Sequence, residues 1–151
     1  MIYLSLGANI GDRAGNLSKA IQLLEEKLSV NLIKSSILEN EAVGFQTEDL
    51  FLNQVVAMED CKKSPTELLD LCQQIEVEIG REPHSVAYNQ DGSRAYSSRV
   101  IDIDILLYHN LKIDNERLQI PHPQMFKREF VMIPLREIIS ERELLEAQNC
   151  F

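Results

Sequence analysis

The pattern of hydrophobic and polar positions predicts a chain that alternates between strands and helices. Short apolar runs rich in β-branched residues are typical of strands, whereas apolar residues recurring every three or four positions are typical of amphipathic helices. The first pattern predicts strands at residues 2–6, 30–38, 50–58 and 99–108, with a short hairpin partner near 111–113. The second predicts helices at residues 14–28, 65–79 and 130–139.

The first two helices carry clear local signals. Asp12 is a candidate cap for the first, whose expected buried face is Leu17, Ala20, Ile21, Leu24 and Leu28. Ser64, Pro65 and Glu67 form the start signal of the second, with a capping serine, a proline in the first turn and a glutamate that completes a capping box. Gly80 is its expected stop, and its expected buried face is Leu68, Leu69, Cys72, Ile75 and Ile79.

The order of these elements predicts the fold class. Strand, helix, strand, strand, helix, strand is the ferredoxin-like βαββαβ order, an α+β fold with a mainly antiparallel sheet and helices covering it. The last predicted helix adds a C-terminal helical extension. We expect one domain over residues 1–151, in which residues 81–98 form a long loop.

Composition and charge narrow the class of partner. The chain has 151 residues and a formal net charge of −9, which argues against nucleic acid or an anionic membrane as a partner. The three cysteines, Cys61, Cys72 and Cys150, suggest neither a disulfide framework nor a zinc site. No apolar run is long enough for a membrane span or a signal peptide, so we expect a cytoplasmic protein.

The strand at 99–108 contains two acidic residues within an apolar run. Asp102 and Asp104 are two positions apart, so both point to the same face of the strand. Such a pair is favourable with a cation such as Mg²⁺ between the carboxylates, and Arg81 and Arg99 at the ends of the long loop could bind phosphate. The simpler alternative is a pair of solvated acids, or acids paired with Arg99 or Arg94.

Other residues suggest a site for a flat ligand. Phe51 and Asn53 share one face of a predicted strand, and Phe130 offers a second ring. A planar heterocycle between the rings, with the amide on its edge, would account for all three, although core packing explains the rings equally simply. His122 lies between Pro121 and Pro123, whose rings stiffen its backbone.

Taken together, these motifs resemble one family, the 6-hydroxymethyl-7,8-dihydropterin pyrophosphokinases of folate biosynthesis. The resemblance covers nearly the whole chain and is most specific in Arg-x-x-Asp-Ile-Asp with the downstream Pro-His-Pro. The matching segments are Leu6–Asp12, Ser35-Ser36 with Val43-Gly44, Phe51-Leu-Asn53, Gln73 to Arg81, Arg99 to Asp104, and Pro121-His122-Pro123 followed by Arg128 and Phe130.

The resemblance implies an enzyme that transfers diphosphate from ATP to the pterin hydroxymethyl group and releases AMP. It implies two Mg²⁺ ions held by Asp102 and Asp104, and a catalytic set of Arg81, Arg99, Asp102 and Asp104. It implies that ATP is bound by Gln73, Glu76, Arg81, Arg99, Ile105, Arg117, His122 and Arg128. It implies that the pterin is bound by Asn40, Val43, Phe51, Asn53, Asp102 and Phe130. A monomer is expected.

The chain departs from the family pattern in the segments that lead to the site. Asn40-Glu41-Ala42 stands where many relatives have Thr-x-Pro, Glu82-Pro83-His84 follows Arg81 where basic residues are common, and Tyr96 stands where a tryptophan is common. The first departure leaves the backbone there less constrained, whereas the two in the long loop put its contacts to ATP in doubt; the acid pair is intact. A ferredoxin-like module that binds a ligand without chemistry, or a degenerate relative, is the alternative interpretation.

Overall fold

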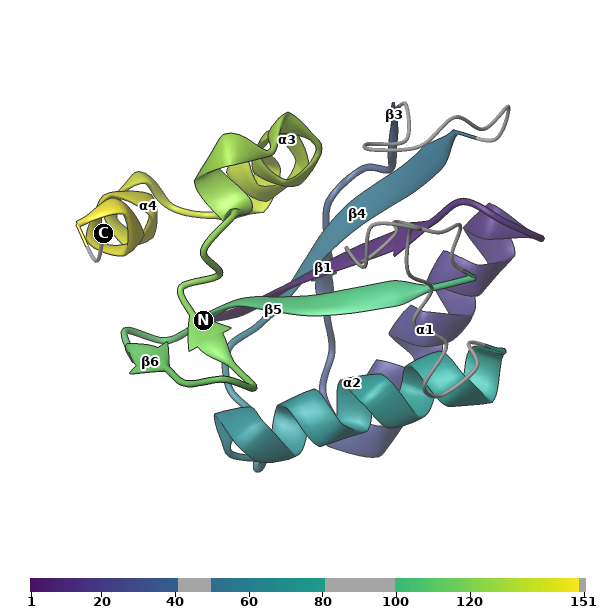
Figure 1. Ribbon diagram of the computed structural model, residues 1–151, viewed down its shortest axis with the longest axis horizontal. Coiled ribbons are helices and arrows are strands. Elements are labelled where there is room, and N and C mark those ends of the chain that lie inside the picture. Colours follow the sequence, from purple (N-terminus) through teal and green to yellow (C-terminus); the bar gives the residue numbers. More distant parts are fainter. Residues whose placement is uncertain (41–49, 81–99, 150–151) are drawn as a thin grey trace, which may run out of the picture.

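The computed structural model describes residues 1–40, 50–80 and 100–149. Its elements alternate along the chain as the hydrophobic pattern predicts (Figure 1). In chain order they are β1 Ile2–Ala8, α1 Arg13–Leu28, β2 Ile33–Lys34, β3 Leu38–Asn40, β4 Phe51–Met58, α2 Pro65–Ile79, β5 Asp102–Tyr108, β6 Ile113–Asp114, β7 Gln119–Ile120, a 3-10 helix Met125–Lys127, α3 Glu129–Ile138 and α4 Glu141–Gln148.

The main sheet is antiparallel throughout the part of the chain that the structure describes. Its strand order is β2-β4-β1-β5, with β3 also paired to β4, while β6 and β7 form a separate hairpin. The two central strands are therefore β4 and β1, and helices pack on the sheet. This arrangement confirms the predicted ferredoxin-like α+β fold.

The prediction of a single strand at residues 30–38 is wrong. The segment forms two short strands, β2 and β3, and the chain breaks away from the ladder at Ser35. The Ser35 hydroxyl accepts a hydrogen bond from the Val55 amide at 2.9 Å, and the Ser35 amide donates to the Val55 carbonyl at 2.9 Å. The Gln54 side chain donates to the Ser35 carbonyl at 2.8 Å. A serine side chain therefore replaces one backbone partner and interrupts the regular ladder.

The two long helices begin where the sequence predicts. The Asp12 side chain accepts from the Gly15 amide at 3.1 Å and caps α1. Ser64 and Glu67 form the expected capping box at the start of α2, which ends at Gly80 with a φ of 131°. The expected buried face of α2 needs one correction: Leu71 is buried, whereas Leu69 and Ile79 are only partly buried against the core.

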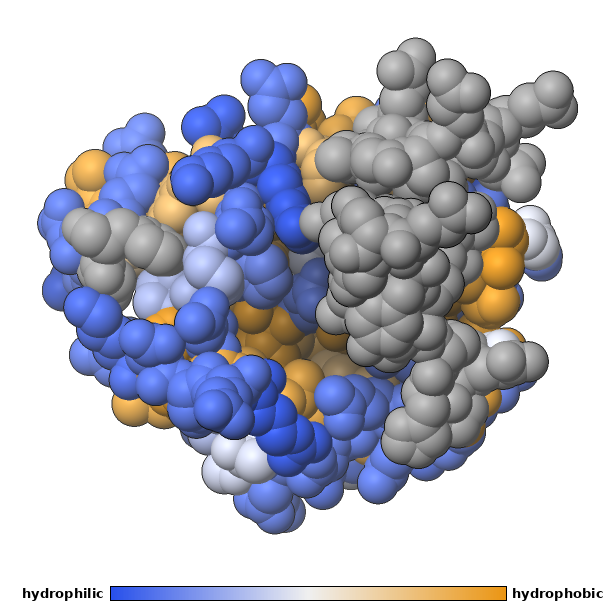
Figure 2. All heavy atoms as spheres, in the orientation of Figure 1, coloured by the Kyte–Doolittle hydropathy of each residue, from blue (hydrophilic) through white to orange (hydrophobic). Residues whose placement is uncertain are grey.

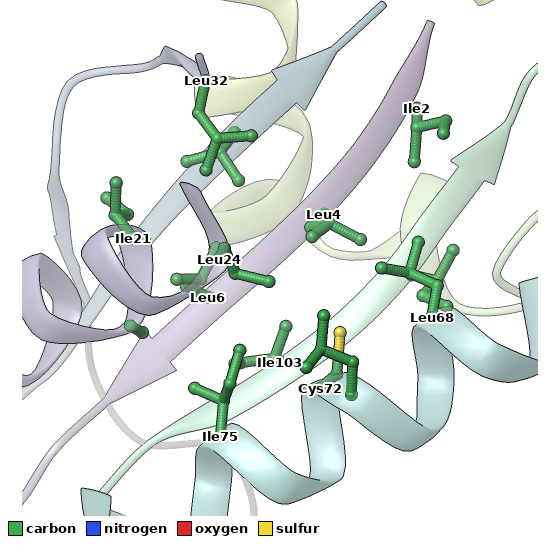
Figure 3. Close-up of a cluster of buried hydrophobic side chains, with 14 of the residues drawn as sticks. Ile2, Leu4, Leu6, Ile21, Leu24, Leu32, Leu68, Cys72, Ile75 and Ile103 are labelled. Carbon is green, nitrogen blue, oxygen red and sulfur yellow. The ribbon is translucent and has the colours of Figure 1, made fainter. Parts of the chain in front are cut away.

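Each face of the sheet has its own helical layer. Figure 3 shows Leu4 and Leu6 of β1 packed between Leu24 of α1 and Ile75 of α2, with Ile103 of β5 beside them. On the opposite face, a second apolar cluster joins β1 and β4 to α3, α4 and the 3-10 helix; it includes Tyr3, Val55, Met125, Val131 and Leu135. The first cluster reaches Ala8 and Ile101, so α1 and α2 bury their face at both ends of the sheet, whereas the second cluster takes only Tyr3 from β1.

The C-terminal extension consists of two helices. Pro134 lies inside α3 and is buried, and the amphipathic α4 buries Ala147 against the second cluster. Within the described residues, we find no helix with the length and apolar character needed to cross a membrane.

Candidate active site

Three adjacent strands align their polar residues at one end of the sheet. Gly7 on the central strand β1 lies opposite Asn53 on β4 and opposite Asp102 on β5. Directly opposed residues of antiparallel strands point to the same face, and neighbouring strands lie about 4.8 Å apart. Asn53 and Asp102 therefore flank Gly7 on the face away from α1 and α2.

Gly7 leaves space between these two side chains. A Cβ atom at this position would lie 3.1 Å from Asn53 Oδ1 and 4.0 Å from Cδ1 of the Phe51 ring. From the sequence, Gly7 was noted only as part of the matching segment Leu6–Asp12. The signal that could have revealed it was a glycine at the end of an apolar strand, which often marks a close approach of a ligand or another chain segment.

The acid pair lies on the same face as the gap at Gly7. Asp102 and Asp104 are half-buried, whereas Ile103 and Ile105 point to the opposite face and are 4% and 3% exposed. The β1 residues opposite the two aspartates are the small Gly7 and Ser5. The predicted same-face orientation is therefore confirmed.

The donor set at the acid pair fits a hard divalent cation. Among residues 1–40, 50–80 and 100–149, no group of three or more His, Cys, Asp and Glu side chains could hold a metal ion. Two carboxylates on one face of a strand offer the hard oxygen ligands that such a cation prefers. Mg²⁺ in nucleotide enzymes is held in this way, by one or two carboxylates together with substrate phosphates.

Arg128 and Asp102 both lie close enough to His122 to act on it electrostatically. The His122 amide donates to the Leu106 carbonyl at 3.0 Å, which ties this turn to β5. Burial and the positive charge of Arg128 lower the pKa of His122, and the negative charge of Asp102 partly opposes them. The Gln124 amide donates to Nδ1 of His122 at 3.2 Å, so the neutral ring carries its proton on Nε2 and can donate it in a hydrogen bond.

The balance of charges around His122 can be tested by titration. In the protein without ligands, we expect the ring to titrate below the usual pKa of 6.5, as followed by the NMR shift of its Cε1 proton. Arg128→Gln should raise the midpoint and Asp102→Asn should lower it further, because the two charges act in opposite directions. A wild-type midpoint above 6.5 would contradict the geometry.

The sign of the linked stability change follows from the lowered pKa. Because the unfolded chain binds the proton first, the contribution of His122 is fully present above pH 6.5 and is lost as pH falls through the lower, folded pKa. Denaturant titrations at several pH values should show His122→Asn losing this part of the pH dependence.

The two aromatic residues proposed for ligand stacking are both half-buried. Phe51 opens β4 next to the gap at Gly7, and Phe130 lies in the first turn of α3, which packs on β4. The Arg128 guanidinium lies 5.7 Å from the centre of the Phe130 ring, within the range of a cation–π contact. Asn53 is 5% exposed.

A second group of predicted residues gathers on α2 and the β6–β7 hairpin. The Arg117 guanidinium donates to Gln73 Oε1 at 3.3 Å and pairs with the Asp70 carboxylate. The Ile105 side chain is buried toward α2, so a contact of this residue with ATP has to come from its backbone. Glu76 is buried in the same helix, and its carboxylate accepts a hydrogen bond from the backbone of β5.

Some of the predicted residues cannot be placed. Arg81, Arg99 and Val43 lie outside the described residues, as does the long loop predicted at 81–98. Asn40 is at the end of β3, with its backbone opposite Phe51.

One cavity formed by the described residues lies at the other end of β5. It has a volume of about 510 Å³, and its lining includes Met1, Leu107, His109, Arg142 and Glu143. Figure 2 shows hydrophobic side chains in a hollow near the middle of the viewed face, with hydrophilic ones around it. The candidate site is therefore defined by strand register and side-chain chemistry, not by the depth of a cavity.

The fold and these residues define a class of protein. A carboxylate pair beside a histidine and an arginine is suited to binding the phosphates of a nucleotide with a divalent cation. An amide and aromatic rings on the adjacent strand and helix suit a flat heterocycle. This combination, on a ferredoxin-like sheet, describes an ATP-dependent phosphotransferase.

Comparisons with known proteins specify that class. The chain matches the family described as 7,8-dihydro-6-hydroxymethylpterin-pyrophosphokinase (HPPK) over residues 3–140. It is 40% identical to the 2-amino-4-hydroxy-6-hydroxymethyldihydropteridine pyrophosphokinase of Bacillus subtilis over 93% of this chain and 79% of that protein. It is 37% identical to the enzyme of the same name from Haemophilus influenzae, over 97% of this chain and 86% of that protein.

A longer relative contains the same unit. The chain is 34% identical to the mitochondrial folate synthesis bifunctional protein of Pisum sativum, over 92% of this chain and 25% of that protein. The chain belongs to the HPPK family. It is an ATP-dependent diphosphotransferase that transfers pyrophosphate from ATP to hydroxymethyldihydropterin in folate synthesis, so the alternatives without chemistry are wrong.

Proposed function

We propose that Asp102 and Asp104 hold two Mg²⁺ ions and that the pterin lies beside them, over Gly7. The single observation that carries this proposal is the register of β4, β1 and β5, which sets Asn53, Gly7 and Asp102 in one row on one face. The row places the Asn53 amide, which can form hydrogen bonds to a heterocycle, near the Asp102 carboxylate, which can bind a metal ion. Such a row suits a reaction between a pterin and a metal-bound phosphate.

The pterin is bound between the Phe51 and Phe130 rings, with the Asn53 amide on its edge. Asn53 has both a donor and an acceptor, which match a heterocycle edge that presents both. Asp102 borders the pterin on the metal side, and Asn40 and Val43 complete the site. These assignments explain why the nearly buried Asn53 amide lies near the start of β4, opposite Gly7.

ATP is bound by the phosphate-handling residues Arg81, Arg99, Arg128 and His122. His122 donates from Nε2 to a phosphate oxygen, and its lowered pKa keeps the ring neutral at physiological pH. Arg117 and Gln73, which already contact each other, bind the nucleoside part together with the backbone of Ile105. This division follows the two groups of residues described above.

The reaction is an in-line displacement on ATP. The hydroxymethyl oxygen forms a bond to the β-phosphorus, the bond from that phosphorus to the α–β bridging oxygen breaks, and AMP leaves as the alcohol proton is lost. Bound Mg²⁺ supplies charge neutralisation on the phosphate oxygens. The arginines and His122 orient the phosphates, and the aromatic rings and Asn53 hold the hydroxymethyl group in line.

The number of metal ions can be measured directly. With a non-hydrolysable ATP analogue, a pterin and Mn²⁺ in place of Mg²⁺, electron paramagnetic resonance titration should give two bound ions per chain. AMP production from ATP and 6-hydroxymethyl-7,8-dihydropterin should require the divalent ion and stop with excess EDTA. One bound ion at saturation would contradict the two-ion proposal without affecting the assignment of the reaction.

We also propose that the enzyme works as a monomer in the cytoplasm. All residues assigned to the site come from one chain, and both substrates are small molecules. Sedimentation equilibrium of the full chain tests the oligomeric state.

A further inference from the structure

Glu76 is an acidic residue in an unusual place. It lies near the end of α2 with an exposed fraction of 6%, and no other acidic or basic side chain of the described residues falls in the buried class. Taking a carboxylate out of water is unfavourable unless hydrogen bonds or charges compensate for it. A buried carboxylate therefore needs a reason to be there.

The Glu76 carboxylate is bonded to the strand that carries the acid pair. Its Oε2 accepts a hydrogen bond from the Ile103 amide at 2.8 Å. Ile103 stands between Asp102 and Asp104, and in the described sheet β5 is an edge strand paired only with β1. Glu76 thus supplies the acceptor that a further strand would otherwise provide at this point.

This hydrogen bond holds Ile103, the residue whose orientation determines which way Asp102 and Asp104 point. The Ile103 side chain packs in the core with Cys72 and Ile75 of α2, so the residue is held by its side chain and by its amide. Side chains alternate along a strand, so fixing Ile103 toward α2 directs both aspartates to the other face. A one-residue slip of this edge strand would move both carboxylates to the opposite face, away from the substrates.

Glu76 also contributes charge to the same region. Burial raises the pKa of the Cys72 thiol, and the negative charges of Glu76 and Asp104 raise it further. Cys72 therefore lies within electrostatic range of both carboxylates. A geometric role and a purely electrostatic role of Glu76 predict different results for different substitutions, which makes them separable.

We propose that Glu76 is a positioning residue for the metal site, holding the Ile103 amide so that Asp102 and Asp104 face the substrates together. The inference rests on the proposed role of the two aspartates as metal ligands. Glu76 then acts on ATP through the strand, in place of the direct ATP contact that the family resemblance implies. Partners of metal ligands in other enzymes commonly change metal affinity by about 10- to 100-fold when they are removed.

Three substitutions distinguish the effect of the length of the Glu76 side chain from the effect of its charge. Glu76→Gln keeps the length and an acceptor oxygen but removes the charge, Glu76→Asp keeps the charge but shortens the side chain by one methylene, and Glu76→Leu removes both. We expect Gln to bind Mn²⁺ within about threefold of wild type in the presence of the ATP analogue, and Asp and Leu to lose about tenfold or more. In turnover, kcat should fall in the Asp and Leu variants while KM for the pterin changes little.

A matched control removes a neighbouring buried side chain of α2. Leu71→Ala creates a cavity in the same helix and should lower the free energy of unfolding without changing Mn²⁺ affinity. If Glu76→Leu does not fold, the comparison of Gln with Asp decides the question alone. Normal Mn²⁺ affinity in Glu76→Asp together with a large loss in Glu76→Gln would overturn the proposal in favour of charge.

Different results would contradict the metal assignment and the positioning role of Glu76. If Asp102→Asn binds Mn²⁺ as wild type does, the metal assignment is wrong. If Asp102→Asn loses the metal but Glu76→Leu and Glu76→Asp keep it, only the positioning role is wrong.

Discussion

Asp102→Ala and Asp104→Ala should each reduce kcat by about a thousandfold or more while the protein stays folded. The physical reason is the loss of one of the two carboxylates proposed to hold the metal ions that neutralise the transferring phosphates. A thousandfold change corresponds to about 4 kcal/mol in the activation barrier. Initial rates of AMP formation at saturating ATP, Mg²⁺ and pterin measure it.

The control removes the same charge elsewhere. Asp60 follows β4 at the far end of the sheet, where it pairs with His109 at 3.0 Å, so Asp60→Asn should leave kcat unchanged. Circular dichroism and thermal unfolding should show folded protein for both aspartate variants, because both acids are half-buried at the end of a strand whose apolar residues remain. Activity within about tenfold of wild type, or about 1.4 kcal/mol, would refute the metal assignment.

The fold was predictable where neighbouring residues along the chain carry the signal. The start of α2 is an example, because the capping serine, proline and glutamate are adjacent in sequence and act locally. The break at Ser35 was not predictable, because it depends on the Val55 amide, which is 20 positions away in the chain. The choice of Leu71 over Leu69 for the buried face likewise depends on how α2 lies on the sheet.

The candidate site likewise has features that the sequence predicts and features that depend on contacts between distant residues. The alternation of strand residues was enough to put Asp102 and Asp104 on one face, and the structure confirms it. The row formed by Asn53, Gly7 and Asp102 could not be derived from the sequence, since it depends on the register of three strands. The contact of Glu76 with Ile103 also joins residues distant in the chain, and from the sequence the resemblance implies only that Glu76 binds ATP.

Asn53→Ala should raise KM for the pterin by about ten- to a hundredfold and leave KM for ATP nearly unchanged. Removing the amide leaves hydrogen-bonding groups of the bound heterocycle without a partner in a nearly buried position, which costs about 1–3 kcal/mol. Steady-state kinetics with each substrate varied separately gives the two KM values. An unchanged KM for the pterin would show that the Asn53 amide does not form hydrogen bonds to the heterocycle.

Gly7→Ala tests the same site without removing any ligand-binding group. The added Cβ would lie 3.1 Å from Asn53 Oδ1, closer than ordinary van der Waals contact, so the amide has to shift. We expect a smaller rise in KM for the pterin, of a few fold, because a displaced amide retains part of its hydrogen bonding. If the glycine acts through Asn53, its effect should largely disappear in the Asn53→Ala background, since a double-mutant cycle isolates the coupling between two neighbours. Additive effects of the two substitutions would instead mean that the methyl group acts on the pterin directly and not through Asn53.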